Sequence, residues 1–405
     1  MANNSMTILE LFHRLGATKD VDFLREGVKV LAQAVMELEV KVKTGADKHE
    51  RTAERKVYRN GYRDRIWDTR VGSIDLKIPK VREGSFFPSL LEPRRRTEKA
   101  LLTVVQEAYV HGVSTRKVDD LVKSLGLEGV SKSEVSRICA ELDDLVEQFR
   151  NRPLDAAYPY LWLDATYIKV RENGHVLGMA AVVAVGVRST GEREVLGLDL
   201  GPAEDRTFWL SFLRSLVARG LHGVRLVISD AHEGLKGALN AALGMATWQR
   251  CRVHFMRNVL SQIPKAAQNV VGAAVRSIFV QPDQEAAREQ LRRVADGLQD
   301  KYPKVAALLD DAAEDVLAYM AFPSEHRRQI HSTNTLERLN FEIKRRTDVV
   351  GIFPNRAAVI RLVGAVLAEQ NDEWLTGRRY FSQESMSKLS ELGTPPNVSG
   401  LLAAD

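Results

Sequence analysis

Residues 160–169 read Tyr-Leu-Trp-Leu-Asp-Ala-Thr-Tyr-Ile-Lys, and this stretch decides the fold. Its aromatic and β-branched side chains are typical of a buried strand, yet Asp164 stands in the middle of the run. Burying an ionised carboxylate without a partner costs several kcal/mol, so Asp164 needs a cation or hydrogen-bond donors beside it. We therefore predict that other parts of the chain supply such partners to this strand.

Two later stretches carry acids that could lie beside Asp164. Residues 224–230 form a second apolar run that ends on Asp230, and residues 331–346 have the spacing of a polar helix with Glu337 near its start. Mg²⁺ prefers oxygen ligands, and a few carboxylates together with a substrate phosphate are sufficient to hold it. We predict that the three acids gather around metal ions and serve the cutting and joining of DNA.

Each acid alone has an ordinary explanation. An Asp at a strand end is commonly a helix N-cap, and Glu337 by itself would be a solvated helix residue. The prediction therefore depends on the three acids occurring together in this order of strands and helices. On the same predicted helix Arg338, Asn340, Lys344 and Arg345 accompany Glu337, with Lys344 two turns further along the same face, where it would meet DNA phosphate.

Composition limits the class of protein. The chain has 405 residues, of which 44% are hydrophobic, and this length indicates about two to four folded domains. Its two cysteines, Cys139 and Cys251, cannot make a disulfide framework, which fits a reducing cytosol. The N-terminus lacks a secretory signal pattern, and the longest apolar run, residues 176–187, is too short to cross a bilayer. We expect a soluble cytoplasmic protein without a membrane partner.

The order of patterns predicts an α/β protein in seven segments. They are a helical segment (1–50), a basic β-rich segment that contacts DNA (51–99), a helix-turn-helix domain (100–152), the first part of a catalytic α/β domain (153–254), an all-helical insertion (255–331), the last helices of the catalytic domain (332–380) and a tail (381–405). The first helix spans residues 6–43, ends at Gly45 and packs internally, the alternative being a pairing with another copy. The tail is rich in Ser, Gly and Pro and is predicted to be loosely ordered.

The positive charge of the chain is concentrated in residues 51–100, where 14 Lys/Arg stand against 7 Asp/Glu. Asn60-Gly61 predicts a hairpin turn, and a strand with alternating apolar residues follows until Pro79 stops it. A patch of this kind either faces phosphate or is a solvated basic surface without a ligand. The arginines that we predict to contact DNA are Arg55, Arg59, Arg63, Arg65, Arg94, Arg95 and Arg96.

Residues 98–149 show the spacing of three helices. Ser131 and Glu134 form a capping box at the start of the third helix, and apolar side chains of the second and third helices face each other across a glycine turn. This is a helix-turn-helix pattern, although helical pairs without a DNA role are common. The side that could enter a major groove carries Lys132, Ser133, Ser136 and Arg137.

The catalytic segment begins with three strands, at residues 160–169, 176–187 and 194–200, whose short connections predict antiparallel neighbours. A helix, a strand, a second helix and a short fifth strand follow, at residues 204–219, 224–229, 231–243 and 247–253. This order is expected of a ribonuclease H-like fold, in which the first and fourth strands lie side by side. Such a neighbourhood would bring Asp164 and Asp230 together.

Cys251 and His254 form a Cys-x-x-His element after the fifth strand. A structural zinc ion normally takes four ligands, and no second pair of ligands is visible in the sequence. His254 could hydrogen-bond a phosphate or the attacking nucleophile, or it could be an ordinary core histidine.

Several stretches resemble the Mutator-type transposases of bacterial insertion sequences, a branch of the DDE recombinases. They are Leu-Asp-Ala-Thr-Tyr-Ile-Lys-Val-Arg (163–171), Val-Ile-Ser-Asp-Ala-His-Glu-Gly-Leu (227–235), Gln-Arg-Cys-Arg-Val-His-Phe-Met-Arg-Asn (249–258) and Asn-Thr-Leu-Glu-Arg-Leu-Asn-Phe-Glu-Ile-Lys-Arg-Arg (334–346), with Phe-Pro-Asn at 353–355. The resemblance runs from about residue 58 to residue 374 and is most specific around Glu337.

The resemblance implies a ribonuclease H-like catalytic domain interrupted by an all-helical insertion. It implies catalysis by Asp164, Asp230 and Glu337 with Mg²⁺ or Mn²⁺, and an auxiliary role for Cys251 and His254. The implied partners are double-stranded DNA at the terminal inverted repeats, target DNA, and further copies of the chain in a dimer or larger assembly on the bacterial nucleoid. Water would cut one strand, and the freed 3′-hydroxyl would attack a second phosphodiester, with a circular DNA intermediate.

Two other functions fit part of the sequence. A nuclease or junction resolvase on the same fold would cut DNA without joining it. A DNA-binding regulator would use residues 51–149 and keep the later domain as a structural part. Products of joining distinguish a transposase from both.

Overall fold

The computed structural model describes residues 21–391 except 49, 51, 53–54, 70, 92–98, 112, 114, 125–131 and 141. The chain divides into two compact units, residues 1–141 and 142–405. Several predictions lie outside the described residues: the helix over residues 6–20, Arg94, Arg95, Arg96, the capping box at Ser131 and the tail after residue 391. The side chains of Lys132, Ser133 and Ser136 are also outside the description.

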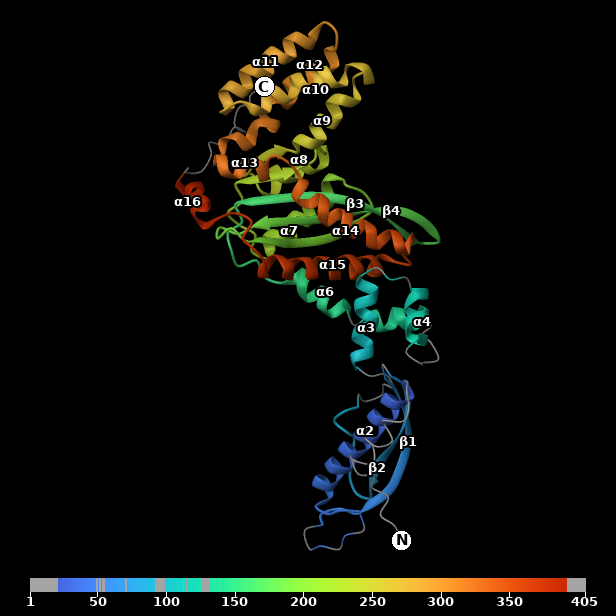
Figure 1. The fold of residues 1–405 in the computed structure, drawn as a ribbon. Coiled ribbons are helices and arrows are strands. Elements are labelled where there is room, and N and C mark those ends of the chain that lie inside the picture. Colours follow the sequence, from blue (N-terminus) through green and yellow to red (C-terminus); the bar gives the residue numbers. More distant parts are fainter. Residues whose placement is uncertain are drawn as a thin grey trace. The chain divides into compact units, whose positions relative to one another are not determined.

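The first unit begins with a helix on a two-stranded antiparallel sheet. The helix is α2 (Val21–Thr44), and the strands are β1 (Arg59–Thr69) and β2 (Gly72–Val81) (Figure 1). Ala32 and Met36 of α2 share a buried cluster with Ile74, Leu76 and Ile78 of β2. The predicted alternation of the strand and the internal packing of the helix are therefore confirmed.

The turn predicted at Asn60-Gly61 is wrong. The chain reverses between Thr69 and Gly72, which are the last paired residues of the two strands. Asn60-Gly61 lies inside β1, where the pairing register shifts between Arg59 and Tyr62 and Gly61 takes a φ of 73°. The glycine therefore serves a β-bulge, which needs the same left-handed backbone as a turn.

Pro79 does not end its strand, because β2 continues to Val81. The proline pairs with Tyr62, directly at the bulge, where the regular ladder of hydrogen bonds is already interrupted. A proline that would stop a regular strand is tolerated at this position.

Three short helices complete the first unit: α3 (Lys99–Val110), α4 (Thr115–Ser124) and α5 (Lys132–Cys139). The three contact one another, and Val118, Val122 and Val135 are buried among them. The third predicted helix differs from the structure, because α5 stops at Cys139 and a separate helix, α6 (Leu142–Asn151), follows. This helix packs on α15 in the second unit, so it does not extend the helices before it.

The second unit contains a five-stranded sheet in the order β5-β4-β3-β6-β7. The strands are β3 (Tyr160–Glu172), β4 (His175–Val187), β5 (Arg193–Gly201), β6 (Leu226–Ser229) and β7 (Thr247–Arg250). The first three are antiparallel neighbours, and β6 and β7 run parallel to β3. The predicted neighbourhood of the first and fourth strands is confirmed.

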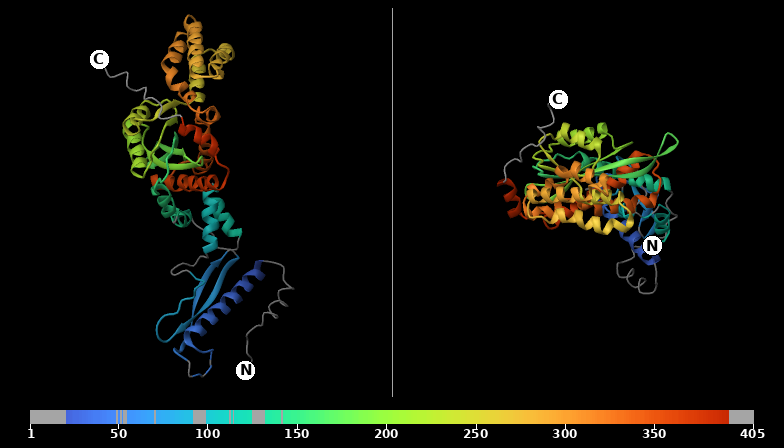
Figure 2. Two further views of the ribbon diagram at one scale, coloured as in Figure 1. Left: turned by 90° about the vertical axis from the view of Figure 1, so that its left-hand side faces the viewer. Right: turned by 90° about the horizontal axis from the view of Figure 1, so that it is seen from above.

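Helices cover both faces of this sheet (Figure 2). One face carries α7 (Arg206–Ala218) and α8 (Glu233–Ala242), and the other carries α14 (Asn334–Val350) and α15 (Arg356–Thr376). Leu161 and Leu163 of β3 enter the core beneath α7. Trp209 of α7 lies in the same core, although the sequence pattern did not predict it as a core residue. Because side chains alternate along a strand, Trp162 and Asp164 point to the face of α14.

The predicted insertion is helical, as expected. It contains α9 (Arg252–Ser261), α10 (Gln268–Arg276), α11 (Gln284–Gln299), α12 (Pro303–Leu317) and α13 (Ser324–Ile330), with short 3₁₀ turns at Lys265–Ala267, Ser277–Val280 and Ala318–Ala321. Pro303 occupies the first turn of α12, where its missing amide hydrogen is not needed. Its helices form a group of their own beyond the sheet in Figure 1.

The predicted loose tail is partly wrong. Residues after Phe381 form a further helix, α16 (Gln383–Glu391), in which Met386 and Leu389 are buried. Packing of this apolar face stabilises a short helix whose composition is otherwise polar. In the part of the chain that is described, no helix combines the length and the apolarity required of a membrane span.

Candidate active site

Asp164 and Asp230 are brought to the same place by the parallel pairing of β3 with β6. Trp162 pairs with Ile228, and Asp164 and Asp230 each lie two residues further along the chain. The same register therefore sets the two carboxylates side by side at the carboxyl end of β6. Asp230 directly follows β6, and its Oδ1 accepts a hydrogen bond from the Ala231 amide at 2.7 Å.

Asp164 is held by donors from two elements. Its Oδ1 accepts from the Ala165 amide at 3.0 Å, and its Oδ2 accepts from Nδ2 of Asn340 in α14 at 2.7 Å. Burial raises the pKa of Asp164 to about 6, although the Ala165 amide and the charge of His254 oppose this rise. The charge of Asp230 acts in the same direction as burial. A cation between the two acids would favour the ionised forms of both.

Helix α14 is fixed to the sheet at both of its ends. Before the helix, Nε1 of Trp162 donates to the Ser332 carbonyl at 3.2 Å. After the helix, Phe353 forms a parallel bridge to Val170 of β3 and is buried. The Phe-Pro-Asn motif then starts α15, because the side chain of Asn355 accepts from the Ala358 amide at 2.9 Å. These anchors determine where the acid of α14 lies.

Glu337 is exposed in the first turn of α14, three residues before Asn340. Residues three apart share one face of a helix, so Glu337 lies on the face that carries the amide bound to Asp164. Among the residues that the structure describes, no three His, Cys, Asp or Glu side chains are arranged to hold a metal ion. The structure therefore brings Asp164 and Asp230 together and leaves Glu337 on the neighbouring helix.

Cys251 and His254 connect β7 to this site. Cys251 is buried, and its sulfur accepts from the amide and the hydroxyl of Thr333 at 3.4 and 3.3 Å. Burial acts to raise the pKa of the Cys251 thiol, but hydrogen bonds with His254 and Thr333 outweigh burial and lower it. Nδ1 of His254 lies 3.8 Å from Oδ1 of Asp230. The pKa of His254 is raised, chiefly by its hydrogen bond to Cys251 and also by the charges of Asp230 and Asp164.

The basic residues of α14 do not form one surface. Lys344 and Arg345 are exposed, and Arg345 bonds to Glu342 at 3.0 Å. Arg346 is buried and lies 3.5 Å from Glu369, so it ties α14 to α15 and is not available to a ligand. Arg338 is exposed next to Glu337 and lines a hollow described below.

The predicted DNA-contacting arginines of the first unit have different surroundings. Arg59 pairs with Glu37 of α2, and Arg55 donates to the Asp47 carbonyl at 3.0 Å. Arg63 and Arg65 both lie over the Phe87 ring, at 5.7 and 5.3 Å from its centre. Arg137 is exposed on α5. Arg55 and Arg59 also line a hollow of about 930 Å³ together with Lys48, Tyr58 and Tyr62.

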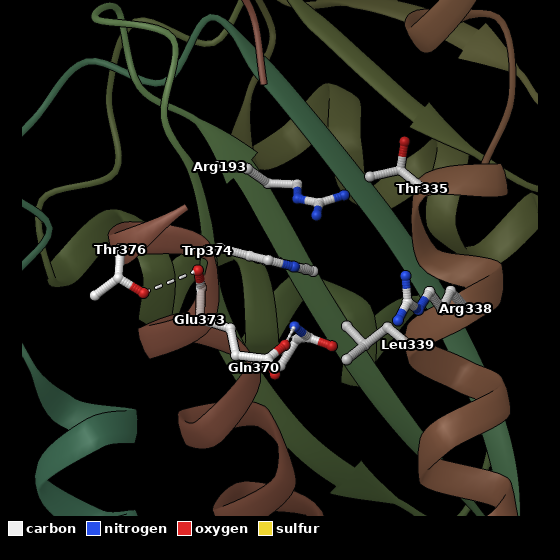
Figure 3. A pocket seen from close by; sticks show the side chains of 8 residues that line it. All are labelled: Arg193, Thr335, Arg338, Leu339, Gln370, Glu373, Trp374 and Thr376. Atoms are coloured by element: carbon white, nitrogen blue, oxygen red, sulfur yellow. Dashed lines mark hydrogen bonds between the residues drawn. The ribbon is translucent and has the colours of Figure 1, made fainter. Parts of the chain in front are cut away.

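Sequence reasoning missed Arg193, at the start of β5. Its guanidinium stacks on Trp374 of α15, 3.6 Å from the ring centre, close to the segment that carries Glu337 (Figure 3). The local sequence shows only an arginine before an apolar strand. Its partner is 181 positions later in the chain, so no spacing rule could have found it.

Comparison with known proteins gives one consistent result. A family model described as "Transposase, Mutator family" matches residues 2–377. A transposase for insertion sequence element IS1081 from Mycobacterium tuberculosis is 51% identical over 369 residues, which are 91% of this chain and 89% of that protein. A transposase for IS256 in transposon Tn4001 from Staphylococcus aureus is 43% identical over 341 residues, 83% of this chain and 87% of that protein. A transposase for ISRM5 from Rhizobium meliloti is 38% identical over 381 residues, 93% of this chain and 96% of that protein.

Proposed function

The chain belongs to the Mutator family of DNA transposases, and on this premise we propose that it binds the terminal inverted repeats of an insertion sequence and catalyses metal-dependent strand cleavage and strand transfer. The observation that carries the proposal is the register of β3 and β6, which sets Asp164 beside Asp230 under a helix that carries a third acid. Such a group of oxygens suits phosphodiester chemistry.

The cation of the proposed reaction is Mg²⁺ or Mn²⁺. Asp164 and Asp230 would hold it, and Glu337 would join them from α14. Two features support this assignment: the two carboxylates offer hard oxygen ligands, and burial makes the isolated charge of Asp164 unfavourable. When bound, the cation would stabilise the negative charge that develops on the phosphodiester.

The side chains around the acids would position them. Asn340 holds Oδ2 of Asp164 and thereby fixes the orientation of that carboxylate. His254 stands beside Asp230, where it would keep that acid in place and accept or donate a proton. We infer hydrolysis of one strand first, followed by attack of the freed 3′-hydroxyl on a second phosphodiester. No covalent protein–DNA intermediate is required.

We further propose that the second unit is a ribonuclease H-like catalytic domain interrupted by α9–α13. The strand order and the mixture of antiparallel and parallel pairs support this assignment. In the first unit we propose that α4 and α5 act as a helix-turn-helix. We also propose that Arg63 and Arg65, on the strand that precedes these helices in the chain, contact the phosphates of the DNA backbone. Guanidinium groups gathered around an aromatic ring suit contacts with nucleic acid.

The proposal is tested with duplex DNA that carries the flanking element end. The protein is incubated with this DNA and Mg²⁺, and every new strand end is mapped. We expect cut ends together with joined products. Cut ends without joined products would instead assign the chain to the nucleases or junction resolvases, and binding without any new end would assign it to the DNA-binding regulators.

We propose that the protein acts as a dimer through α2. Apolar side chains of this helix recur at alternating steps of four and three residues: Leu24, Val28, Leu31, Val35, Leu38 and Val42. Val28 packs on the cluster with β2, and the other five form an exposed row. Within this row Leu38 is 63% and Val42 81% exposed. Valine and leucine alternating in this heptad pattern favour a two-stranded coiled coil with a second copy of the same helix.

Replacing Leu31 by Glu is expected to weaken this dimer about 30-fold or more, since a central interface residue contributes about 2 kcal/mol or more. Analytical ultracentrifugation across a concentration series measures the change. Val280→Glu is the matched control, because Val280 is 78% exposed on the helical insertion and does not belong to α2. A wild-type protein that sediments as a monomer, or a Leu31→Glu variant that keeps the wild-type dimer, contradicts the proposal.

A further inference from the structure

A hollow of about 400 Å³ opens between the start of β5, the first turns of α14 and the end of α15 (Figure 3). It is lined by Arg193, Thr335, Arg338, Leu339, Gln370, Glu373, Trp374 and Thr376. Two of these residues, Arg338 and Leu339, follow Glu337 directly in the chain. The hollow therefore adjoins the helix turn that carries the third acid.

Arg193 is the fixed cation of this hollow. Its guanidinium lies 3.6 Å from the centre of the Trp374 ring and 4.8 Å from that of Tyr380, so stacking holds its plane in one orientation. Its Nε is buried and has no hydrogen-bond partner among the described residues. Burial, together with the nearby charge of Arg338, lowers the pKa of Arg193 to about 10. Two like charges thus face a common space.

No ion pair within the described residues joins Arg193 or Arg338 to a carboxylate, and in Figure 3 the two guanidinium groups point toward one another across the hollow. The acid in the lining, Glu373, accepts a hydrogen bond from Gln370 at 2.5 Å. Holding two cations together in a partly buried place is unfavourable without an anion. The arrangement therefore indicates an anionic ligand with several oxygens.

A second, smaller hollow of about 280 Å³ lies on the other side of a shared lining residue. The two share Thr335, whose hydroxyl lies 2.7 Å from that of Tyr380. Arg328 lines the second hollow and, like the other two arginines, is not joined to a carboxylate by any ion pair in the described part of the chain. Three arginines, Arg193, Arg328 and Arg338, therefore line the two hollows near the beginning of α14, with Thr335 common to both hollows.

We propose that these two hollows receive consecutive backbone phosphates of one DNA strand, Arg193 and Arg338 binding one phosphate and Arg328 the next. The inference rests on the proposed function, and it adds the path by which the strand reaches Glu337. Guanidinium groups match phosphate oxygens with paired hydrogen bonds, and the stacked orientation of Arg193 makes its donors ready for such a contact. Phosphate contacts of this kind position a strand without reading its sequence.

The test measures the binding of fluorescein-labelled single-stranded DNA to the full chain by anisotropy over a range of salt concentrations. Each lost phosphate contact is expected to lower the slope of log affinity against log salt by about 0.7. We expect this loss for Arg338→Gln and for Arg328→Gln, whose exposed side chains can be replaced without disturbing the core. Arg193→Gln should behave alike, and Arg193→Lys should restore the slope because it restores the charge.

Arg214→Gln is the matched control, because Arg214 is an exposed arginine on α7, which covers the opposite face of the sheet. Its slope should equal that of the wild type. A second arm places one neutral methylphosphonate at successive positions of the strand. The wild type should lose affinity at particular positions, and Arg338→Gln should show no further loss at one of them.

Unchanged slopes for Arg338→Gln and Arg328→Gln, with wild-type melting temperatures, would overturn this inference. The proposed chemistry fails separately. Asp164→Asn is expected to keep the wild-type slope while it stops cleavage. If the arginine variants show reduced salt slopes but the wild type does not cleave DNA, only the catalytic proposal is refuted. If the wild type cleaves normally but the arginine variants keep the wild-type slope, only the strand path is refuted.

Discussion

Replacing Asp164 by Asn is expected to slow strand cleavage and joining by about 10³-fold or more, because charge stabilisation by a bound cation contributes several kcal/mol and each 1.36 kcal/mol is a factor of ten. Asparagine keeps the size of the side chain and its acceptor toward the Ala165 amide, so the strand should fold normally. What is lost is the negative charge that would hold the cation. Binding of the element-end DNA should be largely retained.

Cleavage of end-labelled element DNA under single-turnover conditions measures this effect. Asp311→Asn is the control, because Asp311 is exposed on α12 and takes no part in the site. Both variants should bind the DNA, and only the first should fail to cut it. Cleavage retained by Asp164→Asn at the wild-type rate would remove this residue from the chemistry and, with it, the proposed metal site.

The second large effect is on stability, at Glu194 of β5. This side chain is 3% exposed and accepts from Arg152 at 2.8 Å, Arg188 at 2.7 Å and Tyr158 at 2.8 Å. Glu194→Ala would leave the half-buried guanidinium of Arg152 without its acid and leave Arg188 with only the exposed Asp155, 3.5 Å away. We expect the free energy of unfolding of the second unit to fall by about 3–5 kcal/mol, the usual cost of breaking a buried ion pair from one side.

Denaturant unfolding monitored by tryptophan fluorescence measures this loss. Glu314→Ala is the control, because Glu314 and its partner Arg288 form an exposed pair, which contributes about 1 kcal/mol or less. Equal unfolding midpoints for the two variants would show that the Glu194 network does not hold the segment before β3 to the sheet.

The same carboxylate predicts a pH dependence. Burial acts to raise the pKa of Glu194, but the hydrogen bonds from Arg188, Arg152 and Tyr158 outweigh it and lower the pKa below its ordinary value of 4.5. A lowered pKa in the folded state means that the stabilisation is complete above the ordinary pKa and is lost as the pH falls through the folded-state pKa. The stabilities of wild type and Glu194→Ala should therefore converge in acid.

The sheet could be predicted because its signals are local. Alternating apolar residues, short hairpins and a terminal acid are each visible within about ten residues, and the order of strands then fixes which strands are neighbours. For the same reason the pairing of Asp164 with Asp230 followed from the fold. The exposure of Glu337 did not, because it depends on how α14 is anchored, and its anchors at Ser332 and Phe353 bond to a strand far away in sequence.

Other features escaped prediction for physical reasons. Asn60-Gly61 favours a left-handed backbone, which serves a turn and a bulge equally, so only the pairing of β1 with β2 decides between them. The stack of Arg193 on Trp374 joins an edge strand to the end of a helix, and neither residue has a local pattern. The Cys-x-x-His spacing at Cys251 raised the question of a zinc ligand, whereas the sulfur of Cys251 accepts hydrogen bonds from Thr333.

That sulfur contact has a mechanical consequence. Cys251 stands where the helical insertion leaves the sheet and Thr333 where it returns, and the Arg252 amide also bonds the His331 carbonyl at 3.0 Å. The two ends of the insertion are therefore bonded to each other where they meet the sheet. Because the ends are already held together, lengthening or exchanging the inserted helices should cost the catalytic domain little loop-closure entropy. The same contact fixes Thr333, four residues before Glu337, so the point where the insertion closes also holds the start of the helix that carries the third acid.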